Sequence, residues 1–352
     1  MNKLGRLLTA MVTPFNAEGA LDYRQARALA RALLNSGSDG VLLSGTTGES
    51  PTLTREEKLR LFTEVKSEVA NRGAVVAGTG NYNTRESQEL TKEAEKIGVD
   101  ACLLVVPYYN RPTQQGLYQH FKAIAEVTSL PCIIYNVPSR TVTNISADTV
   151  IKLSQINNIV GIKEASGNLE QIAKIIEETK AKRSLEPFAP CYSERSEESR
   201  SAQGKLHEEP DNAQDRLREG SGKFLVYSGN DNDTLPILAL GGYGVISVAS
   251  HILGIQIKKM MEKFLNGEVQ EAASIHRHLL PLLNTLFVVP NPVPIKYALN
   301  YLGFPVGKPR LPLVEPDEEP AQLIRATLAR YKIDLPLPSS KQKSKGKSKN
   351  AK

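Results

Sequence analysis

The sequence contains few of the side chains from which disulfide frameworks and metal sites are built. It has three cysteines and five histidines among its 352 residues. Cys102, Cys132 and Cys191 show neither a pairing pattern nor a metal-ligand spacing, and the first two lie in apolar runs. His276 and His278 are two positions apart, so a helix would place them on different faces. We therefore expect no metal and no cofactor, and we expect reduced thiols in a cytoplasmic protein.

Long apolar runs are also missing. None approaches the roughly 20 residues that a membrane-spanning helix needs. The amino-terminal run over residues 7–12 is too short for the apolar part of a signal peptide, and it ends at Thr13 and Pro14. These absences indicate a protein without a membrane partner.

Excess charge is confined to one end of the chain. The formal net charge is +6, and the final stretch SSKQKSKGKSKNAK carries six lysines and no acid, so the remainder is formally neutral. A segment of serine, lysine and glycine has too little apolar surface to fold. A solvated, disordered tail is therefore favoured over an arm that binds polyanions, and we do not expect nucleic acid as a partner.

What the sequence does contain is a regular alternation of apolar runs and amphipathic segments. The apolar runs are LLTAMV, GVLLS, AVVAGTG, DACLLVV, PCIIYN, NIVGIK, FLVYSG and GVISV. Helical patterns lie between them, and TREE at residues 54–57 has the form of a capping box. Continuous apolar strands alternating with helices predict parallel strands covered on both faces, here an α/β (β/α)8 TIM barrel. An open doubly wound sheet is the alternative, which the absence of a G-x-G-x-x-G turn after the first strand disfavours.

The pattern also divides the chain. We expect a catalytic barrel over residues 1–253, a helical appendage over 254–333 and a lysine-rich tail over 334–352. A polar, aperiodic stretch at about 184–222 separates a helix from the seventh strand, where such connections usually take two to six residues. Because it leads from a helix to a strand, it should emerge opposite the active site. We interpret it as a flexible insertion that catalysis does not need.

Residues that could carry chemistry follow four of the predicted strands, and the carboxyl ends of barrel strands face the active site. The turn SGTTGES offers hydroxyls and free amides that suit a carboxylate or phosphate. Taken singly, strand-end tyrosines can simply pack, and a lone arginine can be a surface group. The set as a whole consists of Thr46, Thr47, Tyr108, Tyr109, Tyr135, Arg140 and Lys163.

Lys163 is the most informative member of this set, because it ends the apolar run NIVGIK. Its side chain could reach out to water, or it could be kept from water so that the amine is neutral and nucleophilic. A buried lysine beside phenols, without histidine or cysteine, fits carbonyl chemistry through a Schiff base. The amine attacks a keto group, and a phenol moves the protons.

At this point the sequence resembles the 4-hydroxy-tetrahydrodipicolinate synthase (dihydrodipicolinate synthase) family. This family belongs to the pyruvate-dependent class I aldolases, which include N-acetylneuraminate lyase. The resemblance runs from Leu7 to about Ile333, apart from the insertion. Asn230 departs mildly from the aspartate more familiar at that position. The matching motifs are GTTGES, PYYNRPTQQG, YNVPSRT, GIKEASGN, SGNDNDTLPILALGGYGVISV and NPVPIKYAL.

The resemblance implies catalytic roles for four residues. Lys163 would form the Schiff base with pyruvate, and Tyr135 would act as the general acid and base beside it. Thr46 would link Tyr135 to Tyr109 in a proton relay. In the family this last tyrosine comes from the neighbouring subunit, so a dimer is the minimum active unit and a homotetramer, a dimer of dimers, is the usual assembly.

The resemblance also implies the two substrates and their contacts. Thr47 and its turn would bind the pyruvate carboxylate, and Ile246 would add a backbone contact to pyruvate. Arg140 would bind the carboxylate of L-aspartate 4-semialdehyde. The product would feed the diaminopimelate and lysine pathway. Two rivals stay open: a related aldolase for a sugar acid, which YNVPSRT and NPVPIK disfavour, and an idle barrel whose tail binds polyanions, which the full residue set disfavours.

Regulation is a separate expectation. In feedback-sensitive relatives, lysine binds at the dimer interface, and Tyr108 and Glu86 fit that site. Pro51, Arg55, Lys58 and Tyr82 do not match it, and the charges of Arg55 and Lys58 would repel a lysine ammonium group. We expect weak or absent inhibition by lysine.

Overall fold

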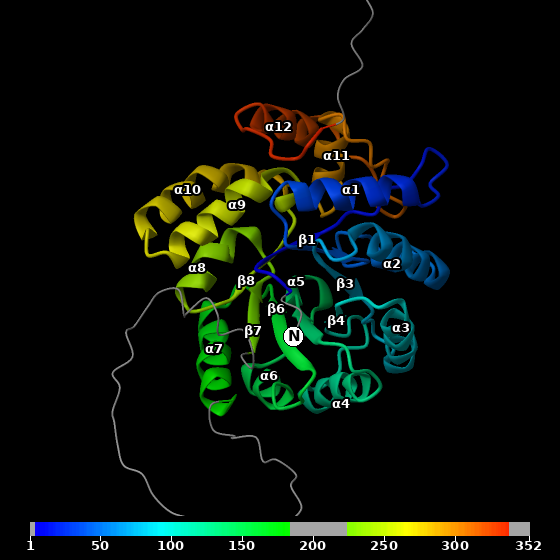
Figure 1. The fold of residues 1–352 in the computed structure, drawn as a ribbon, viewed down its shortest axis with the longest axis vertical. Helices are drawn as coiled ribbons and strands as arrows, with labels where there is room; N and C mark the ends of the chain where they lie inside the picture. Colours follow the sequence, from blue (N-terminus) through cyan, green and yellow to red (C-terminus); the bar gives the residue numbers. More distant parts are fainter. Residues whose placement is uncertain (1–3, 184–223, 338–352) are drawn as a thin grey trace, which may run out of the picture.

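The structure is a computed structural model that describes residues 4–183 and 224–337. The predicted insertion, Cys191 and nearly all of the predicted tail therefore lie outside the described residues. Eight parallel strands close into a barrel in sequence order, with β8 pairing with β1 (Figure 1). This confirms the predicted (β/α)8 architecture. The strands are β1 Leu7–Ala10, β2 Gly40–Leu43, β3 Ala74–Gly78, β4 Ala101–Val105, β5 Cys132–Asn136, β6 Ile159–Glu164, β7 Leu225–Ser228 and β8 Gly244–Ser247.

Helices surround the barrel, and most begin where the sequence provides a cap. Asp22, Thr113 and Ser146 each accept a hydrogen bond from a backbone N–H in the first turn of their helix. The predicted capping box is present, with Thr54 and Glu57 bonding reciprocally. The helices are α1 Tyr23–Asn35, α2 Arg55–Val69, α3 Thr84–Ile97, α4 Gln114–Ala125, α5 Pro138–Thr141, α6 Ala147–Leu153, α7 Leu169–Arg183 and α8 Thr234–Ala239.

Alternate strand residues build two apolar layers. One layer fills the barrel interior, with Leu8, Leu42, Val76, Leu103 and Ile133 among its members. The intervening strand positions pack outward against the helices in a much larger cluster. Both faces of every strand are thus buried, which explains why the strands read as continuous apolar runs.

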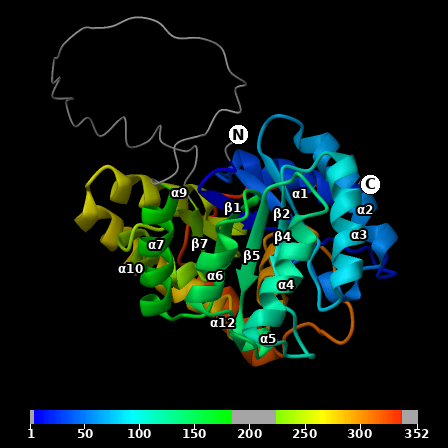
Figure 2. The same cartoon turned by 90° about the horizontal axis from the view of Figure 1, so that it is seen from below.

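Four further helices form the carboxyl-terminal part, coloured yellow to red in Figure 1. The first of them starts at Ser250, earlier than the predicted boundary at 254, and contains a non-helical residue, Leu253, with φ −126° and ψ 23°. In the view of Figure 2 the arrow of β5 points toward α5, at the end of the barrel where the α12 label also lies. The helices are α9 Ser250–Leu265, α10 Val269–Thr285, α11 Val293–Tyr301 and α12 Glu318–Leu328. In the described part of the chain, no helix combines the length and apolarity needed to cross a membrane.

Candidate active site

Lys163 lies at the carboxyl end of β6, inside the barrel. Its exposed surface is only 5%, and its Nζ atom lies 4.3 Å from the centre of the Tyr135 ring. The two residues are register partners on neighbouring parallel strands, which brings their side chains together. Burial lowers the pKa of Lys163 from 10.5 to about 8, while the charge of Asp231 acts in the opposite direction. Roughly a tenth of the amine is therefore neutral at pH 7 and able to attack a carbonyl carbon.

Tyr135 is the phenol nearest to this amine, and it too is buried. Burial raises the pKa of its hydroxyl, whereas a hydrogen bond with the Thr46 side chain and the charge of Arg140 lower it. The phenol therefore carries its proton at neutral pH, beside an amine that is partly deprotonated. Such a pair can pass a proton to and from a reacting group.

A cavity of about 230 Å³ opens at this end of the barrel. Thr46, Tyr108, Tyr135 and Arg140 contribute to its wall, together with apolar side chains of β4. Pockets for drug-sized ligands usually measure about 300–1,000 Å³, so this cavity suits a small organic acid.

The turn after β2 reaches its position through unusual backbone conformations. Ser44 and Glu49 have positive φ values of 54° and 56°. Within the turn, the Glu49 N–H donates to the Thr46 carbonyl oxygen at 3.0 Å. Gly78 on β3 permits the close approach, since a Cβ there would lie 2.3 Å from the Ser44 carbonyl oxygen. The Ser44 backbone, at the start of this turn, is therefore packed directly against the neighbouring strand.

Asn291 is a residue of the site that sequence reasoning missed. Its Nδ2 group donates to Thr47 Oγ1 at 2.9 Å, and its carbonyl oxygen accepts from Arg140 Nη2 at 3.3 Å. Its Oδ1 atom is buried and has no hydrogen-bond partner among the described residues. Asn291 thus connects the two residues predicted to bind the two substrate carboxylates. Asn291 is the first residue of the motif NPVPIK, but nothing in the sequence indicated which residues it would contact.

The structure places the remaining predicted residues in different ways. Thr46, Tyr135 and Arg140 line the cavity. Lys163 lies beside Tyr135, and Thr47 is linked to Arg140 through Asn291. Ile246 is buried in the barrel interior on β8, with 1% of its surface exposed. Tyr109 does not line the cavity: it is 93% exposed, with a left-handed φ of 70°.

The family model described as "Dihydrodipicolinate synthetase family" matches residues 3–185 and 202–331. The chain belongs to the dihydrodipicolinate synthetase family. The unmatched residues between these ranges fall inside the stretch that we interpret as an insertion. Within the family, this member is 58% identical over 337 residues to the 4-hydroxy-tetrahydrodipicolinate synthase of Dehalococcoides mccartyi (strain ATCC BAA-2266 / KCTC 15142 / 195), and the match covers 96% of this chain and 100% of that protein.

Solved structures of dihydrodipicolinate synthases have the same fold. The crystal structure of the Bacillus anthracis enzyme matches with a TM-score of 0.80 and 41% identity, covering 94% of this chain and 99% of that one. A dihydrodipicolinate synthase variant described as monomeric matches with a TM-score of 0.79 and 36% identity, covering 92% and 95%. The resemblance stated from the motifs is thereby confirmed.

Asn230, the position at which this family member departs from the more familiar aspartate, is well accommodated. Its Nδ2 group donates to Asp233 Oδ2 at 2.9 Å, and its carbonyl oxygen accepts from Ser228 Oγ at 2.7 Å. The next residue, Asp231, is 4% exposed and accepts hydrogen bonds from the backbone N–H groups of Val248 and Ala249. Asp231 therefore both fixes the turn after β8 and supplies the negative charge that acts on Lys163.

Arg55, Lys58 and Glu86, at the lysine site that the resemblance implies, interact with other residues of this chain. Arg55 pairs with Glu93 at 2.9 Å. Burial lowers the pKa of Lys58, and the charge of Glu86 raises it. Asn81 and Asn83 also donate to the Glu86 carboxylate. The Glu86 carboxylate therefore already has partners within the chain.

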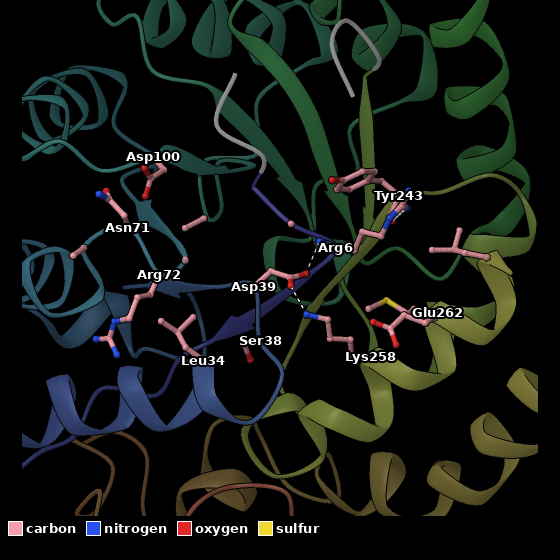
Figure 3. Close-up of a pocket in the computed structure, with 16 residues that line it drawn as sticks. Arg6, Leu34, Ser38, Asp39, Asn71, Arg72, Asp100, Tyr243, Lys258 and Glu262 are labelled. Atoms are coloured by element: carbon pink, nitrogen blue, oxygen red, sulfur yellow. Dashed lines mark hydrogen bonds and ion pairs between the residues drawn. The ribbon is translucent and has the colours of Figure 1, made fainter. Parts of the chain in front are cut away.

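A larger cavity, of about 810 Å³, lies at the opposite end of the barrel (Figure 3). Two of its acidic wall residues have partners within the protein: Asp39 accepts from the Arg6 backbone and pairs with Lys258 at 2.7 Å, and Asp100 pairs with Lys66. Because the chemistry of a (β/α)8 barrel sits at the carboxyl ends of the strands, we assign the site to the smaller cavity. Across residues 4–183 and 224–337, no three His, Cys, Asp or Glu side chains lie close enough together to hold a metal ion.

Proposed function

We propose that Lys163 is the residue through which this chain condenses pyruvate with L-aspartate 4-semialdehyde. The product is 4-hydroxy-tetrahydrodipicolinate, so the protein is a lyase of the diaminopimelate and lysine pathway. The observation that carries the assignment to Lys163 is its Nζ atom, buried at the carboxyl end of β6 and 4.3 Å from the Tyr135 ring centre.

The reaction begins when the neutral Lys163 amine attacks the keto carbon of pyruvate. Loss of water gives an iminium ion, which draws electrons and lets the methyl group release a proton. The resulting enamine carbon attacks the aldehyde carbon of the second substrate. The amino group of that substrate then attacks the iminium carbon, which closes the ring and frees the lysine. Tyr135 donates and accepts protons along this sequence.

Each substrate carboxylate has a proposed position. The backbone amides of the Gly45–Thr47 segment and the Thr47 hydroxyl bind the carboxylate of pyruvate, and the Ile246 backbone contacts pyruvate from β8. Arg140, at the mouth of the cavity, binds the carboxylate of L-aspartate 4-semialdehyde. Thr46 passes protons between Tyr135 and Tyr109.

The proposed assembly is a homotetramer built as a dimer of dimers, in which Tyr109 serves the site of the neighbouring subunit. Support comes from the conformation of this residue, a tyrosine held 93% exposed at a positive φ beside the cavity residue Tyr108. An exposed aromatic side chain of this kind is available to pack against another chain. Cys102 and Cys132 are free and buried, which supports a reducing compartment such as the cytoplasm.

The test is an assay of the purified protein with pyruvate and L-aspartate 4-semialdehyde, run beside Lys163→Ala. We expect turnover by the natural chain and a loss of more than about 10³-fold in the variant. Borohydride with pyruvate alone should add mass to Lys163 in the natural chain only. Turnover of a sugar acid such as N-acetylneuraminate, without turnover of the semialdehyde, would instead identify the related aldolase.

A further inference from the structure

A second buried lysine lies close to the site, and it belongs to an ion pair. Lys296 Nζ on α11 lies 2.7 Å from Glu49 Oε1, and each side chain has only 1% of its surface exposed. The Lys308 carbonyl oxygen also accepts from Lys296 Nζ, at 3.1 Å, and the ammonium lies 4.1 Å from the centre of the Phe15 ring. The second oxygen of Glu49 accepts from the Arg310 backbone N–H at 2.8 Å. Each charged group therefore has at least one partner besides the other.

Glu49 belongs to the turn that is proposed to hold pyruvate. Its backbone N–H donates to the Thr46 carbonyl oxygen, and its own φ is left-handed. The neighbouring carbonyl oxygen, that of Gly48, accepts from Thr13 Oγ1 at 2.7 Å. The Glu49 side chain is therefore anchored on a residue whose backbone is hydrogen-bonded to Thr46.

Two side chains from one segment of the helical appendage contact the turn after β2. Asn291 bonds to Thr47, and Lys296, five positions later, pairs with Glu49. The first contact joins residues 244 positions apart in the chain, and the second joins residues 247 positions apart. The turn is thus held from the helical appendage as well as from the barrel.

A buried ion pair is weak support for stability, because the desolvation of both charges offsets their attraction, and apolar replacements are often tolerated. What such a pair does well is to fix one arrangement of the groups that carry it, since any other arrangement leaves a charge unpaired. The binding of a carboxylate by backbone amides needs that kind of fixed geometry.

We propose that Glu49 and Lys296 are positioning residues that hold the Gly45–Thr47 segment in the geometry required to bind the pyruvate carboxylate. The inference rests on the proposed function, since it names how the pyruvate site of that reaction is kept in place. Neither residue contacts the reacting atoms. Because the Lys296 ammonium is held by a carboxylate, it does not compete with Lys163 for the keto group.

The experiment compares four variants with the natural chain: Lys296→Met, Glu49→Gln, the double variant and Lys66→Met. Lys66→Met is the control, because it removes a lysine from a carboxylate at a similar distance, 2.8 Å against 2.7 Å, in the Lys66–Asp100 pair at the other end of the barrel. For each protein we would measure the pyruvate concentration that half-saturates borohydride labelling of Lys163, the KM and kcat for both substrates, and the unfolding temperature.

We expect Lys296→Met and Glu49→Gln to raise the half-saturating pyruvate concentration about tenfold, which corresponds to roughly 1.4 kcal/mol of binding free energy. The kcat at saturating pyruvate should change less than about threefold, because the reacting groups are untouched. The double variant should recover unfolding temperature relative to Lys296→Met, because it leaves no unpaired buried charge, but it should not recover pyruvate affinity. Lys66→Met should leave the pyruvate affinity unchanged.

Several results would overturn the inference. These are an unchanged pyruvate affinity in the folded double variant, a pyruvate affinity that recovers together with the unfolding temperature, or an equal loss in Lys66→Met. If Lys296→Met fails to fold, the double variant and Glu49→Gln decide the matter. A natural chain that pyruvate and borohydride do not label would refute the proposed function, and the positioning inference with it. Labelling of the natural chain with unaffected variants would refute the inference alone.

Discussion

The burial of Lys163 has a consequence for stability that can be measured without any substrate. The group is held in the folded protein with its pKa lowered from 10.5 to about 8 by burial. A shift of one unit corresponds to about 1.4 kcal/mol, so the folded protein carries a penalty of roughly 3 kcal/mol for the protonated lysine at neutral pH. Replacing Lys163 with methionine, an apolar side chain of similar length, should remove this penalty.

The sign of the pH dependence follows from proton uptake on unfolding. Between pH 8 and 10.5 the unfolded chain still holds the proton that the folded chain has released, so the free energy of unfolding rises with pH through this window. Below pH 8 the penalty is fully present. The stability advantage of Lys163→Met over the natural chain should therefore be about 3 kcal/mol at pH 7 and only about 1 kcal/mol at pH 10.

The measurement is urea unfolding of both proteins at pH 7 and at pH 10. Packing differences between lysine and methionine do not depend on pH, and the other titrating groups are shared, so both cancel in the comparison between the two pH values. An advantage that stays constant from pH 7 to pH 10 would show that Lys163 keeps its ordinary pKa, and the explanation of its reactivity would be wrong. As a second readout, the rate of borohydride labelling with pyruvate should rise with pH around a midpoint near 8.

Further predictions concern the other parts of the site. Tyr135→Phe should lower kcat by about 10²–10⁴-fold, because the variant keeps the ring beside Lys163 but loses the proton-transferring hydroxyl. Steady-state kinetics of the folded variant measures this effect. A fall of less than about tenfold would show that Tyr135 does not transfer the protons. Arg140→Gln should raise the KM for L-aspartate 4-semialdehyde at least about tenfold, since a charge-assisted hydrogen bond is worth about 1.5–3 kcal/mol. The labelling of Lys163 with pyruvate and borohydride should stay the same. Weaker labelling would instead show that Arg140 binds pyruvate. A chain lacking residues 185–221 should fold and keep its activity, and loss of turnover in a folded deletion protein would contradict our interpretation of that stretch. Free lysine should inhibit weakly or not at all, because Glu86 already has partners in the chain, and half-inhibition at submillimolar lysine would refute this.

Of two buried lysines near the site, one could be predicted from the sequence and the other could not. Lys163 was found because a charged residue ending an apolar run stands out in one dimension. Lys296 is also buried, yet it lies within a helix, and its partner Glu49 is 247 positions away in the chain. The two amines differ in what they contact: Lys163 lies beside a phenol and Lys296 is paired with a carboxylate. These contacts are made in the folded protein and cannot be read from the sequence.

Tyr109 is a residue that the sequence predicted at the site but that the single chain does not place there. The motif placed it in the catalytic set, whereas the fold of a single chain leaves it exposed and gives the cavity wall to its neighbour Tyr108. Adjacent residues point in different directions once the backbone takes a positive φ at Tyr109, and no periodicity in the sequence shows such a conformation.

By itself, the sequence determined the barrel and the identity of the residues at its carboxyl ends. The spacing of apolar residues specifies strands buried on both faces, and the order of strands in a closed parallel barrel follows the order of the chain. Only the tertiary structure decided which of those residues share a cavity, how far Lys163 lies from Tyr135, and that Asn291 and Lys296 return from the appendage to hold the turn after β2. The physical reason is that burial, pKa shifts and hydrogen bonds depend on neighbours in space, and here those neighbours come from segments more than two hundred residues apart.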